Sequence, residues 1–297
     1  MKALLFSDRP LVTAQMSSLL CDYFEIGFMA YSKDYESLKD FGAKEIIVIN
    51  GEYSPAESLA REIVSYMKEY DYIFIGATVL GREVGAMAAA ISGAEMKSEI
   101  IEFGIKDGKT TTKRLYYGGK TVLEEESNAK IFTVSQGLKE TKKIESSPKK
   151  NEIELKTKSS VELGEKIQKA TTSTDITKAD IIVSIGRGLS KKEDLSIITD
   201  FASVMHAELA GSRPICADYH WLEEERQVGL SGKKVNPKLY IAIGISGQIQ
   251  HIAGMRGSKT VIAINKDKSA PIFSECDYGI VGDLYSIVPK LTKILRG

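Results

Sequence analysis

A buried strand that breaks directly into a helix at two glycines is the feature that most constrains this chain. The apolar run Leu239–Ile243 leads into Gly244-Ile-Ser-Gly247, and an amphipathic helical pattern follows. A helix that begins this way points its free N–H groups and the positive end of its dipole beyond the strand. The sequence therefore predicts an anion site above Ser246 and Gly247, where the missing side chain lets a phosphate approach the backbone. His251 lies about one turn into the helix, and we expect there a charge that switches near neutral pH.

Composition narrows the class of protein. The chain has 297 residues, of which 43% are hydrophobic, enough for two domains or one large one. Its 40 basic residues balance 40 acidic ones, so no net field favours nucleic acid. Asp8 and Arg9 come too early for a signal peptide, and no apolar run is long enough for a membrane span, so we expect a cytoplasmic protein. The three cysteines are far apart, which disfavours a disulfide frame or a zinc site.

The first half reads as alternating strands and helices, which predicts βαβ units and a mainly parallel sheet. The expected strands are 2–6, 45–49 and 72–75, and the expected helices cover 55–67 and 83–91. From 98 to 134 the pattern becomes hairpin-like, with turns at Asp107-Gly108 and Gly118-Gly119, and we expect it to extend the same sheet.

Residues 138–168 are crowded with Lys, Glu and Ser, so we interpret them as a connector with one strand near 152–155 and a helix near 161–169. The βα rhythm then restarts. Strands are expected at 180–185, around Tyr240, at 260–265 and at 277–281, and helices at 193–209, after Gly247 and at 284–295. The sequence thus predicts an α/β fold with two doubly wound domains: an N-terminal domain, 1–168, which includes the connector, and a Rossmann-like C-terminal domain, 169–297.

Ligands in open α/β sheets bind beyond the carboxyl ends of the strands, so the residues there are candidates for a site. They are Gly186-Arg187-Gly188, Ser246-Gly247, Asn265-Lys266-Asp267, Gly282-Asp283-Leu284 and the loop 227–232. Glycines for close approach, a helix start for pyrophosphate, and Asn and Asp for sugar hydroxyls suit a large nucleotide. The same glycines can equally be plain turn residues, because the G-x-G-x-x-G fingerprint is absent.

Single residues also keep two interpretations each. His251 can be a core histidine bonded to a backbone carbonyl, and Arg187 and Arg213 can be surface charges or can fork onto phosphate. Trp221 can be a core aromatic or an interface anchor, and the packing role is favoured; residues 223–226 are most simply a solvated helical turn. No nucleophile elbow, zinc-protease motif or Walker loop is present, which indicates a cofactor holder rather than a hydrolase.

Several long motifs, in one order along the second half, resemble the alpha subunit of electron transfer flavoproteins, the FixB-like family. They are 184–189, 211–213, 227–233, 239–255, 263–267, 270–273 and 277–284. The first half resembles the family only in general layout. The resemblance implies a C-terminal domain that binds FAD, a heterodimer with a separate beta subunit, dehydrogenases as electron donors, and a quinone reductase or another redox acceptor. It implies an electron carrier without substrate turnover of its own.

The resemblance also implies which residues bind FAD. They are Arg187, Ser212, Arg213, Gln227, Val228, Gly229, Leu230, Ser231, Ser246, Gly247, Gln248, Ile249, Gln250, His251, Asn265, Asp283 and Leu284. Residues 228–231 would line the flavin, with the Ser231 hydroxyl near N5, and Arg213 would bring positive charge to the ring. Residues 246–251 would hold the pyrophosphate and ribityl chain and place His251 by the N1 and O2 edge, while the last three would lie toward adenosine. A histidine and a helix start there would stabilise the charge that flavin gains on reduction.

The sequence departs from the family pattern at two places, and three functions other than a simple electron carrier stay open. Leu230 stands where many members have Gln, and 217–226 replaces a commoner segment, which affects contacts near the dimethylbenzene edge and the choice of redox partner. Within the family, the rival is an electron-bifurcating assembly whose beta subunit holds a second flavin. Outside it, the rivals are a stand-alone nicotinamide-dependent oxidoreductase and a nucleotide-binding scaffold without a redox role.

Overall fold

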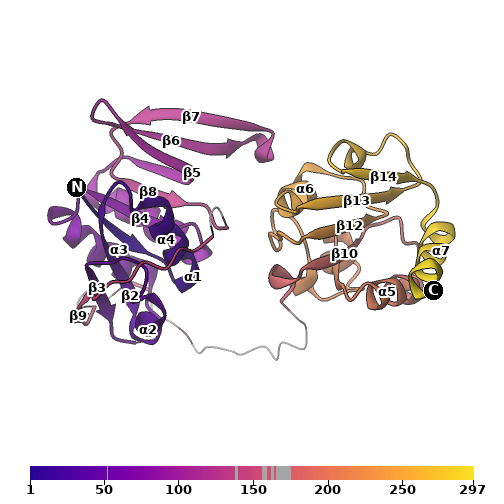
Figure 1. Ribbon diagram of the computed structural model, residues 1–297, viewed down its shortest axis with the longest axis horizontal. Coiled ribbons are helices and arrows are strands. Elements are labelled where there is room, and N and C mark those ends of the chain that lie inside the picture. The colour runs from indigo at the N-terminus through magenta and orange to yellow at the C-terminus, as the bar shows by residue number, and fades with distance from the viewer. Residues whose placement is uncertain (52, 138–139, 156–158, 162–163, 165–174) are drawn as a thin grey trace. The chain divides into compact units, whose positions relative to one another are not determined.

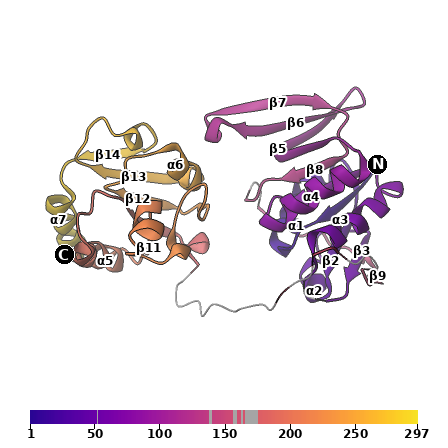
Figure 2. The ribbon, with the colours of Figure 1, turned by 180° about the vertical axis from the view of Figure 1, so that it is seen from behind.

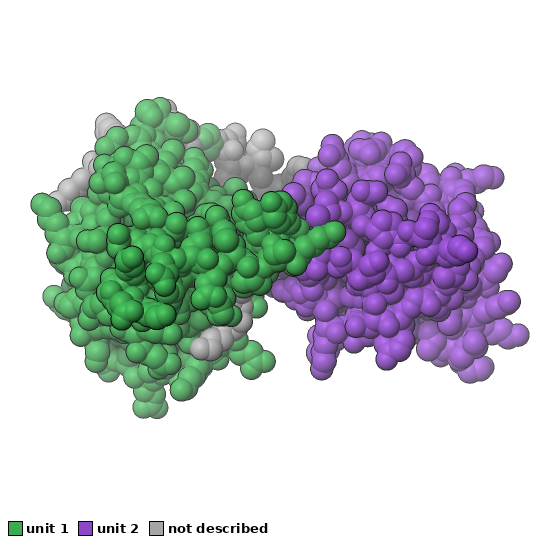
Figure 3. All heavy atoms as spheres, turned by 90° about the horizontal axis from the view of Figure 1, so that it is seen from above, with its two compact units in different colours: residues 1–166 green, residues 167–297 purple. Residues whose placement is uncertain are grey.

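The chain forms two compact units, Met1–Lys166 and Ile167–Gly297 (Figure 3). Each unit has its own buried hydrophobic clusters. The structure is a computed structural model that describes residues 1–51, 53–137, 140–155, 159–161, 164 and 175–297. The domain boundary expected between 168 and 169, and most of the helix expected near 161–169, lie outside the described residues. We refer to the two parts as the N-terminal unit and the C-terminal unit.

The N-terminal unit is built on a nine-stranded sheet in the order β7-β6-β5-β8-β4-β1-β2-β3-β9 (Figure 1). Its strands are β1 (Lys2–Phe6), β2 (Glu25–Tyr31), β3 (Glu45–Ile49), β4 (Tyr72–Gly76), β5 (Met96–Lys106), β6 (Lys109–Tyr116), β7 (Thr121–Ser127), β8 (Ile131–Val134) and β9 (Lys149–Ile153). The central strands β3-β2-β1-β4-β8 are parallel, because strands that are buried on both faces alternate with helices along the chain. This is the doubly wound arrangement that the sequence predicts.

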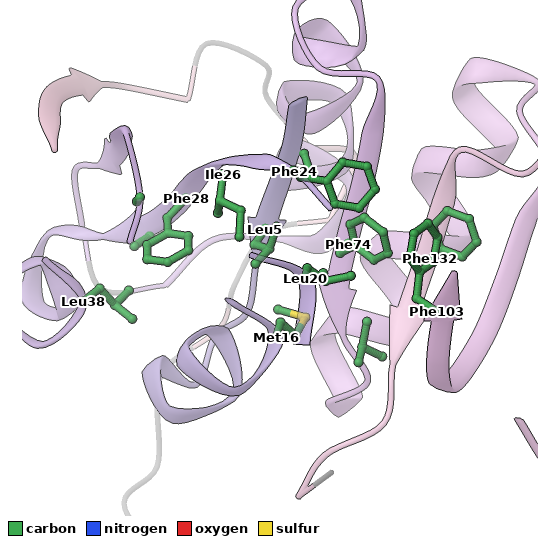
Figure 4. Close-up of a cluster of buried hydrophobic side chains, with 14 of the residues drawn as sticks. Leu5, Met16, Leu20, Phe24, Ile26, Phe28, Leu38, Phe74, Phe103 and Phe132 are labelled. Atoms are coloured by element: carbon green, nitrogen blue, oxygen red, sulfur yellow. The ribbon is translucent and has the colours of Figure 1, made fainter. Parts of the chain in front are cut away.

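Helices cover both faces of that sheet. Side chains of α1 (Pro10–Leu20) and α2 (Tyr35–Leu38) join one core, and those of α3 (Ala56–Ser65) and α4 (Val79–Ser92) join the other. The first core contains packed aromatic rings, with Phe74 stacked on Phe132 at a centroid distance of 5.0 Å and Phe103 edge-on to both (Figure 4). Buried rings contribute large apolar areas, so this cluster anchors the unit.

Two hairpins extend the sheet, as expected for 98–134. Strands β5, β6 and β7 are antiparallel, and the first turn has positive φ at Asp107 and Gly108. The connector also contributes to the sheet, since β9 pairs with β3 from Lys149 onward, a few residues before the strand expected near 152–155. Part of the segment expected to link the two halves therefore belongs to the N-terminal unit.

The C-terminal unit has a five-stranded, fully parallel sheet in the order β11-β10-β12-β13-β14 (Figure 1 and Figure 2). Its strands are β10 (Ile181–Ile185), β11 (Glu208–Gly211), β12 (Leu239–Ile243), β13 (Thr260–Asn265) and β14 (Tyr278–Val281). Helices α5 (Leu195–Val204) and α7 (Leu284–Arg296) pack on one face, and α6 (Ile249–Met255) packs on the other. The chain leaves β10 for β11 on one side and returns to β12 on the other, so the topological switch point lies between β10 and β12.

One expected helix is too long. The sequence predicts a helix over 193–209, but α5 ends at Val204, and His206 takes a positive φ of 50°. Glu208 to Gly211 then pair with β10 as the edge strand β11. Tertiary pairing overrides the helical pattern here, because the edge of β10 offers these residues backbone hydrogen bonds.

Candidate cofactor site

Two glycine loops meet at the switch point, one after β10 and one after β12. The N–H of Gly188 donates to the carbonyl of Gly244 at 3.0 Å, and that of Gly186 donates to Ile243 at 2.9 Å. A Cβ on Gly188 would lie 2.5 Å from the Gly244 Cα, closer than real Cβ atoms approach. Glycine is therefore required here by direct contact between the two backbones. This contact, which we call the glycine joint, fixes both loops at the carboxyl edge of the sheet.

The junction between β12 and α6 has the form that the sequence predicts, but the glycine at its end has a different neighbour. Gly247 has a φ of 83°, and a Cβ there would lie 2.2 Å from the backbone nitrogen of Ile272. Ile272 belongs to the 3₁₀ helix η8 (Pro271–Ser274), and its N–H donates to the Ser246 carbonyl at 3.1 Å. The space that a side chain at Gly247 would take is thus filled by the protein's own backbone, so packing alone requires glycine here. The expectation that a phosphate approaches this backbone stays a prediction.

The loop 227–233 packs against α6 and joins it to β11. The N–H of Leu230 donates to Gln250 at 2.7 Å, and the N–H of Val228 donates to Gly211 at 2.9 Å. Gly229 has a positive φ. A Cβ on Gly254 of α6 would lie 2.3 Å from the backbone nitrogen of Gly229. Val228 is buried, whereas Leu230 is 64% exposed. The hydrogen bonds to α6 and β11 therefore fix the backbone of the loop, while the Leu230 side chain is exposed to solvent.

Polar side chains surround this edge. Arg187 follows β10, and Ser212 and Arg213 follow β11; both guanidinium groups are exposed and Ser212 is largely buried. Ser246, Gln248 and Gln250 are exposed at the start of α6, beside the partly exposed Ile249. Gln227 is buried, and its amide donates to the exposed Ser231 hydroxyl at 3.0 Å.

The three residues expected toward adenosine are differently placed. The Asn265 amide donates to the Ile245 carbonyl at 2.8 Å and its oxygen accepts from Asp267 N–H at 3.0 Å, so its side chain braces the loop after β13. Leu284 is buried in the core at the start of α7, and Asp283 is exposed before it. Asn265 and Leu284 therefore already serve the fold.

His251 is buried under α6, with 7% of its surface exposed. Its Nε2 lies 2.9 Å from the hydroxyl of Tyr240 on β12. Burial lowers the pKa of His251 to about 4. The expectation of a charge that switches near neutral pH is therefore wrong for this chain by itself, because the apolar surroundings disfavour the imidazolium.

Sequence reasoning missed two polar residues: Tyr240, which lies against this histidine, and Ser184, which lies near Tyr240. Both hydroxyls are buried on the α6 face of the sheet. The available signal was a hydroxyl in an otherwise apolar strand, because buried polar groups need partners. The packing role favoured for Trp221 is confirmed, since its ring packs against the core of α5 and α7.

The donor set at this edge fits a dinucleotide. Two arginines and the first N–H groups of α6 suit a diphosphate, and the exposed apolar Leu230 and Ile249 suit one face of a ring. No group of three or more His, Cys, Asp or Glu in the described part of the chain could hold a metal ion. Within the same residues, no helix has the length and apolar character needed to cross a membrane.

Comparison with known proteins places both units in one family. Residues 29–160 match the electron transfer flavoprotein domain, and residues 175–256 match the electron transfer flavoprotein FAD-binding domain. The protein YdiR of Escherichia coli strain K12 is 34% identical over 265 residues, which cover 86% of this chain and 85% of YdiR. The FixB protein of Escherichia coli O6:K15:H31 is 33% identical over 278 residues, covering 90% of this chain and 89% of FixB. The chain therefore belongs to the electron transfer flavoprotein family as a FixB-like alpha subunit, and its C-terminal unit contains the family's FAD-binding domain.

Proposed function

We propose that this chain is the FAD-binding alpha subunit of a heterodimeric electron transfer flavoprotein that accepts electrons from dehydrogenases and passes them to a downstream acceptor. One observation carries the proposal. The switch point of the sheet, with its glycine joint, two exposed arginines and the start of α6, lies at the matched FAD-binding domain. Open α/β sheets bind their cofactors at such points.

The side chains divide the proposed site into parts. Arg187, Arg213 and the N–H groups before Gln250 would hold the pyrophosphate, since guanidinium groups and helix starts both favour anions. Residues 228–231 and Ile249 would lie against the flavin, with the Ser231 hydroxyl free to rotate toward it. FAD supplies the redox chemistry when it is bound, and the protein orients it and sets its electrostatic surroundings.

The adenosine end would be held mainly by backbone. The Asn265 side chain is already bonded to the Ile245 carbonyl and the Asp267 N–H, and the Leu284 side chain is in the core. Their backbone groups and the exposed Asp283 carboxylate are then what remains for the sugar and base. We retain all the residues that the resemblance implies as site residues, with this change in how two of them act.

His251 would act as a neutral base under the flavin site. Burial keeps it unprotonated at pH 7 in the chain alone, with a pKa of about 4. Negative charge gained by a neighbouring group raises the pKa of an imidazole, so reduction of a bound flavin would favour proton uptake there. His251 would therefore stabilise reduced flavin by taking up a proton on reduction, and not by carrying a charge beforehand.

The partners follow from the family rather than from a surface of this chain. Alpha subunits of this family pair with a beta subunit, and we propose a heterodimer of that kind, located in the cytoplasm. The dehydrogenase donors and the acceptor, such as a quinone reductase, would dock on the heterodimer. The chain would turn over no substrate of its own.

The test is the flavin content of the purified protein. The full chain is purified alone and co-expressed with the beta-type subunit, and FAD released by heat is quantified per chain from its visible absorption. One FAD per alpha–beta pair supports the simple carrier, and two support an electron-bifurcating assembly. A colourless protein, with and without the beta subunit, would contradict the flavoprotein proposal.

A further inference from the structure

A buried hydrogen bond ties the sheet of the C-terminal unit to α6, directly below the proposed site. The Tyr240 hydroxyl lies 2.9 Å from His251 Nε2, and the two rings meet edge-on at a centroid distance of 6.2 Å. Tyr240 is fully buried, and His251 nearly so. A hydrogen bond in such apolar surroundings is costly to break, because neither partner can turn to water.

Small residues in the sheet make room for this pair. Ser184, Ala242 and Ala263 stand side by side on β10, β12 and β13, with Ala210 and Gly279 at the two edges of the same row. Tyr240 lies two residues before Ala242 on the same face, between Ile182 and Val261, so the row of short side chains comes next along the strand. The row therefore leaves space between sheet and helix for a phenol and an imidazole.

Ser184 provides a second polar group at the same point. Its hydroxyl is buried and makes no hydrogen bond within the described part of the chain. Burial raises the pKa of Tyr240, and the nearby Ser184 hydroxyl offsets part of that shift. A buried hydroxyl without a partner has a cost that calls for an explanation.

The other nitrogen of the ring indicates which tautomer is present. Nδ1 is buried and has no hydrogen-bond partner among the described residues, and the Val228 backbone is the group that raises the pKa of the ring. Because the Tyr240 hydroxyl already faces Nε2, the Val228 backbone would act on Nδ1, and a proton on Nδ1 would leave Nε2 bare toward Tyr240. The Tyr240 hydroxyl is the donor in this arrangement.

We propose that Tyr240 is a positioning residue that fixes the ring and the Nδ1–H tautomer of His251, and that Ser184 is the partner to which its hydroxyl turns when His251 takes up a proton. The proton comes from solvent water and adds to Nε2. The new Nε2–H donates to the Tyr240 oxygen, and the Tyr240 O–H donates to Ser184 Oγ, so no hydrogen bond is lost. Where it concerns flavin, this inference rests on the proposed function.

Within the described residues, no hydrogen bond or ion pair joins a charged side chain to Tyr240 or His251. The hydroxyls of Tyr240 and Ser184 are therefore the groups that respond to a proton on His251. The ionisable groups on the neighbouring elements are Arg226 and Lys233 on either side of the loop, Arg256 at the end of α6, and Cys216 after β11. Arg256 is paired with Glu275 at 3.1 Å, and burial raises the pKa of the Cys216 thiol to about 12, so it is neutral. The lowered pKa of His251 arises from burial, partly offset by the Val228 backbone.

The tautomer is tested by ¹⁵N NMR of the histidine rings in the full chain. The sequence contains three histidines, and the other two, His206 and His220, are exposed and serve as internal references. At pH 7 the wild type should show His251 as one fixed Nδ1–H tautomer, and Tyr240→Phe should shift its signals toward a mixture of tautomers. An Nε2–H pattern in the wild type, or an unchanged pattern in Tyr240→Phe, would overturn the assignment.

The functional role is tested on the FAD-loaded protein, with its beta-type subunit where needed. Tyr240→Phe and Ser184→Ala should both retain FAD, while the potential of the first reduction step falls and depends differently on pH, most strongly in Tyr240→Phe. Tyr70→Phe is the control, because it removes another buried hydroxyl, one that donates to Glu45 at 2.6 Å in the N-terminal unit.

The outcomes separate the two proposals. If both variants keep the wild-type potential and pH profile, the proposed response of Tyr240 and Ser184 to a proton on His251 is overturned, even where the NMR signals show that Tyr240 fixes the ring. Ser184→Ala removes a single oxygen and decides the question if Tyr240→Phe fails to fold. A wild-type protein without FAD overturns the proposed function, whereas the NMR measurement still decides whether Tyr240 fixes the ring.

Discussion

At the scale of residues, the glycines of the C-terminal unit differ in what surrounds them, and the surroundings decide what a substitution does. Gly188 faces the backbone of Gly244, Gly247 faces Ile272, and Gly229 has a positive φ near Gln250. A backbone neighbour cannot rotate away as a flexible side chain does. Substitutions at the first two positions must therefore move a loop or a strand end.

Gly188→Ala tests the glycine joint. The added methyl would lie 2.5 Å from the Gly244 Cα, so the loops must separate. We expect the free energy of unfolding to fall by about 3 kcal/mol and FAD to be lost on gel filtration. Gly164→Ala is the matched control, because nothing lies within 4 Å of the added methyl there. Equal urea midpoints for the two variants would contradict the claim that the glycine joint requires glycine at position 188.

The buried His251 makes stability depend on pH. Its pKa is lowered to about 4 in the folded chain from an ordinary value near 6.5, so the unfolded chain binds the extra proton first. Its contribution to stability is complete above pH 6.5 and is lost as the pH falls toward 4, by up to about 3 kcal/mol.

Urea unfolding of wild type and His251→Gln at pH 7 and pH 5 measures this contribution. The wild type should lose more stability than the variant over that interval, because glutamine takes up no proton. Carboxylates titrate equally in both proteins, so the difference isolates the histidine. Parallel losses in the two proteins would show that His251 is exposed to solvent in its folded state.

Arg213 is predicted to act on the cofactor and not on the fold. Its side chain is exposed after β11, so Arg213→Ala should change the free energy of unfolding by less than about 0.5 kcal/mol. Loss of a charged hydrogen bond to the cofactor should weaken FAD binding roughly tenfold or more. Fluorescence titration with FAD measures this, with Lys290→Ala on α7 as an exposed control; equal affinities would remove Arg213 from the site.

At the scale of elements, the edge strand β9 shows how a charged segment takes part in a sheet. The Asn151 amide donates to Glu45 at 2.7 Å, and the Ile153 carbonyl accepts from the Asn50 N–H at 3.0 Å. Ile153 also packs against the core that α3 and α4 cover. One apolar side chain and the backbone bonds therefore keep this segment on the sheet.

Ile153→Asp should release β9. Placing a carboxylate against that core should cost about 1 to 3 kcal/mol and speed proteolysis within 140–155. Glu152→Ala is the control, because it removes only a surface ion pair with Lys150, a kind of contact that contributes little. If cleavage proceeds equally fast in both variants, β9 is not held through Ile153.

Strands that are buried on both faces could be predicted from the sequence. Elements whose secondary structure depends on pairing with a neighbouring strand could not. Strands such as β4 and β12 are continuous apolar runs, which identify them without any partner. β11 continues a helical pattern and becomes a strand only because β10 offers an edge. The same holds for the site: the strand ends could be located, but the bond between Tyr240 and His251 depends on how α6 packs on β12.

At the scale of the whole molecule, the chain combines two doubly wound sheets with different strand orders. The N-terminal unit has β3-β2-β1-β4-β8 at its centre, and the C-terminal unit has β11-β10-β12-β13-β14. Each has its own cores, with helices on both faces. The proposed FAD site uses residues of the C-terminal unit only.

A fragment of residues 175–297 should therefore fold without the rest of the chain. We expect a single cooperative urea transition and measurable, though weaker, FAD binding, because the glycine joint and α6 are retained. The fragment 1–161 should fold without binding FAD. Flavin bound by the second fragment and not by the first would contradict the assignment of the site.

The glycine joint also limits how the site can be re-engineered. Side chains elsewhere at the edge, such as the exposed Leu230, can be exchanged for others of different size or polarity. The joint offers no side chain to exchange, because the atoms in contact are backbone atoms of Gly186, Gly188 and Gly244. The distance between the two loops is thus the same whatever side chains surround it. A change of redox potential or of partner has to come from substitutions at the residues around the joint.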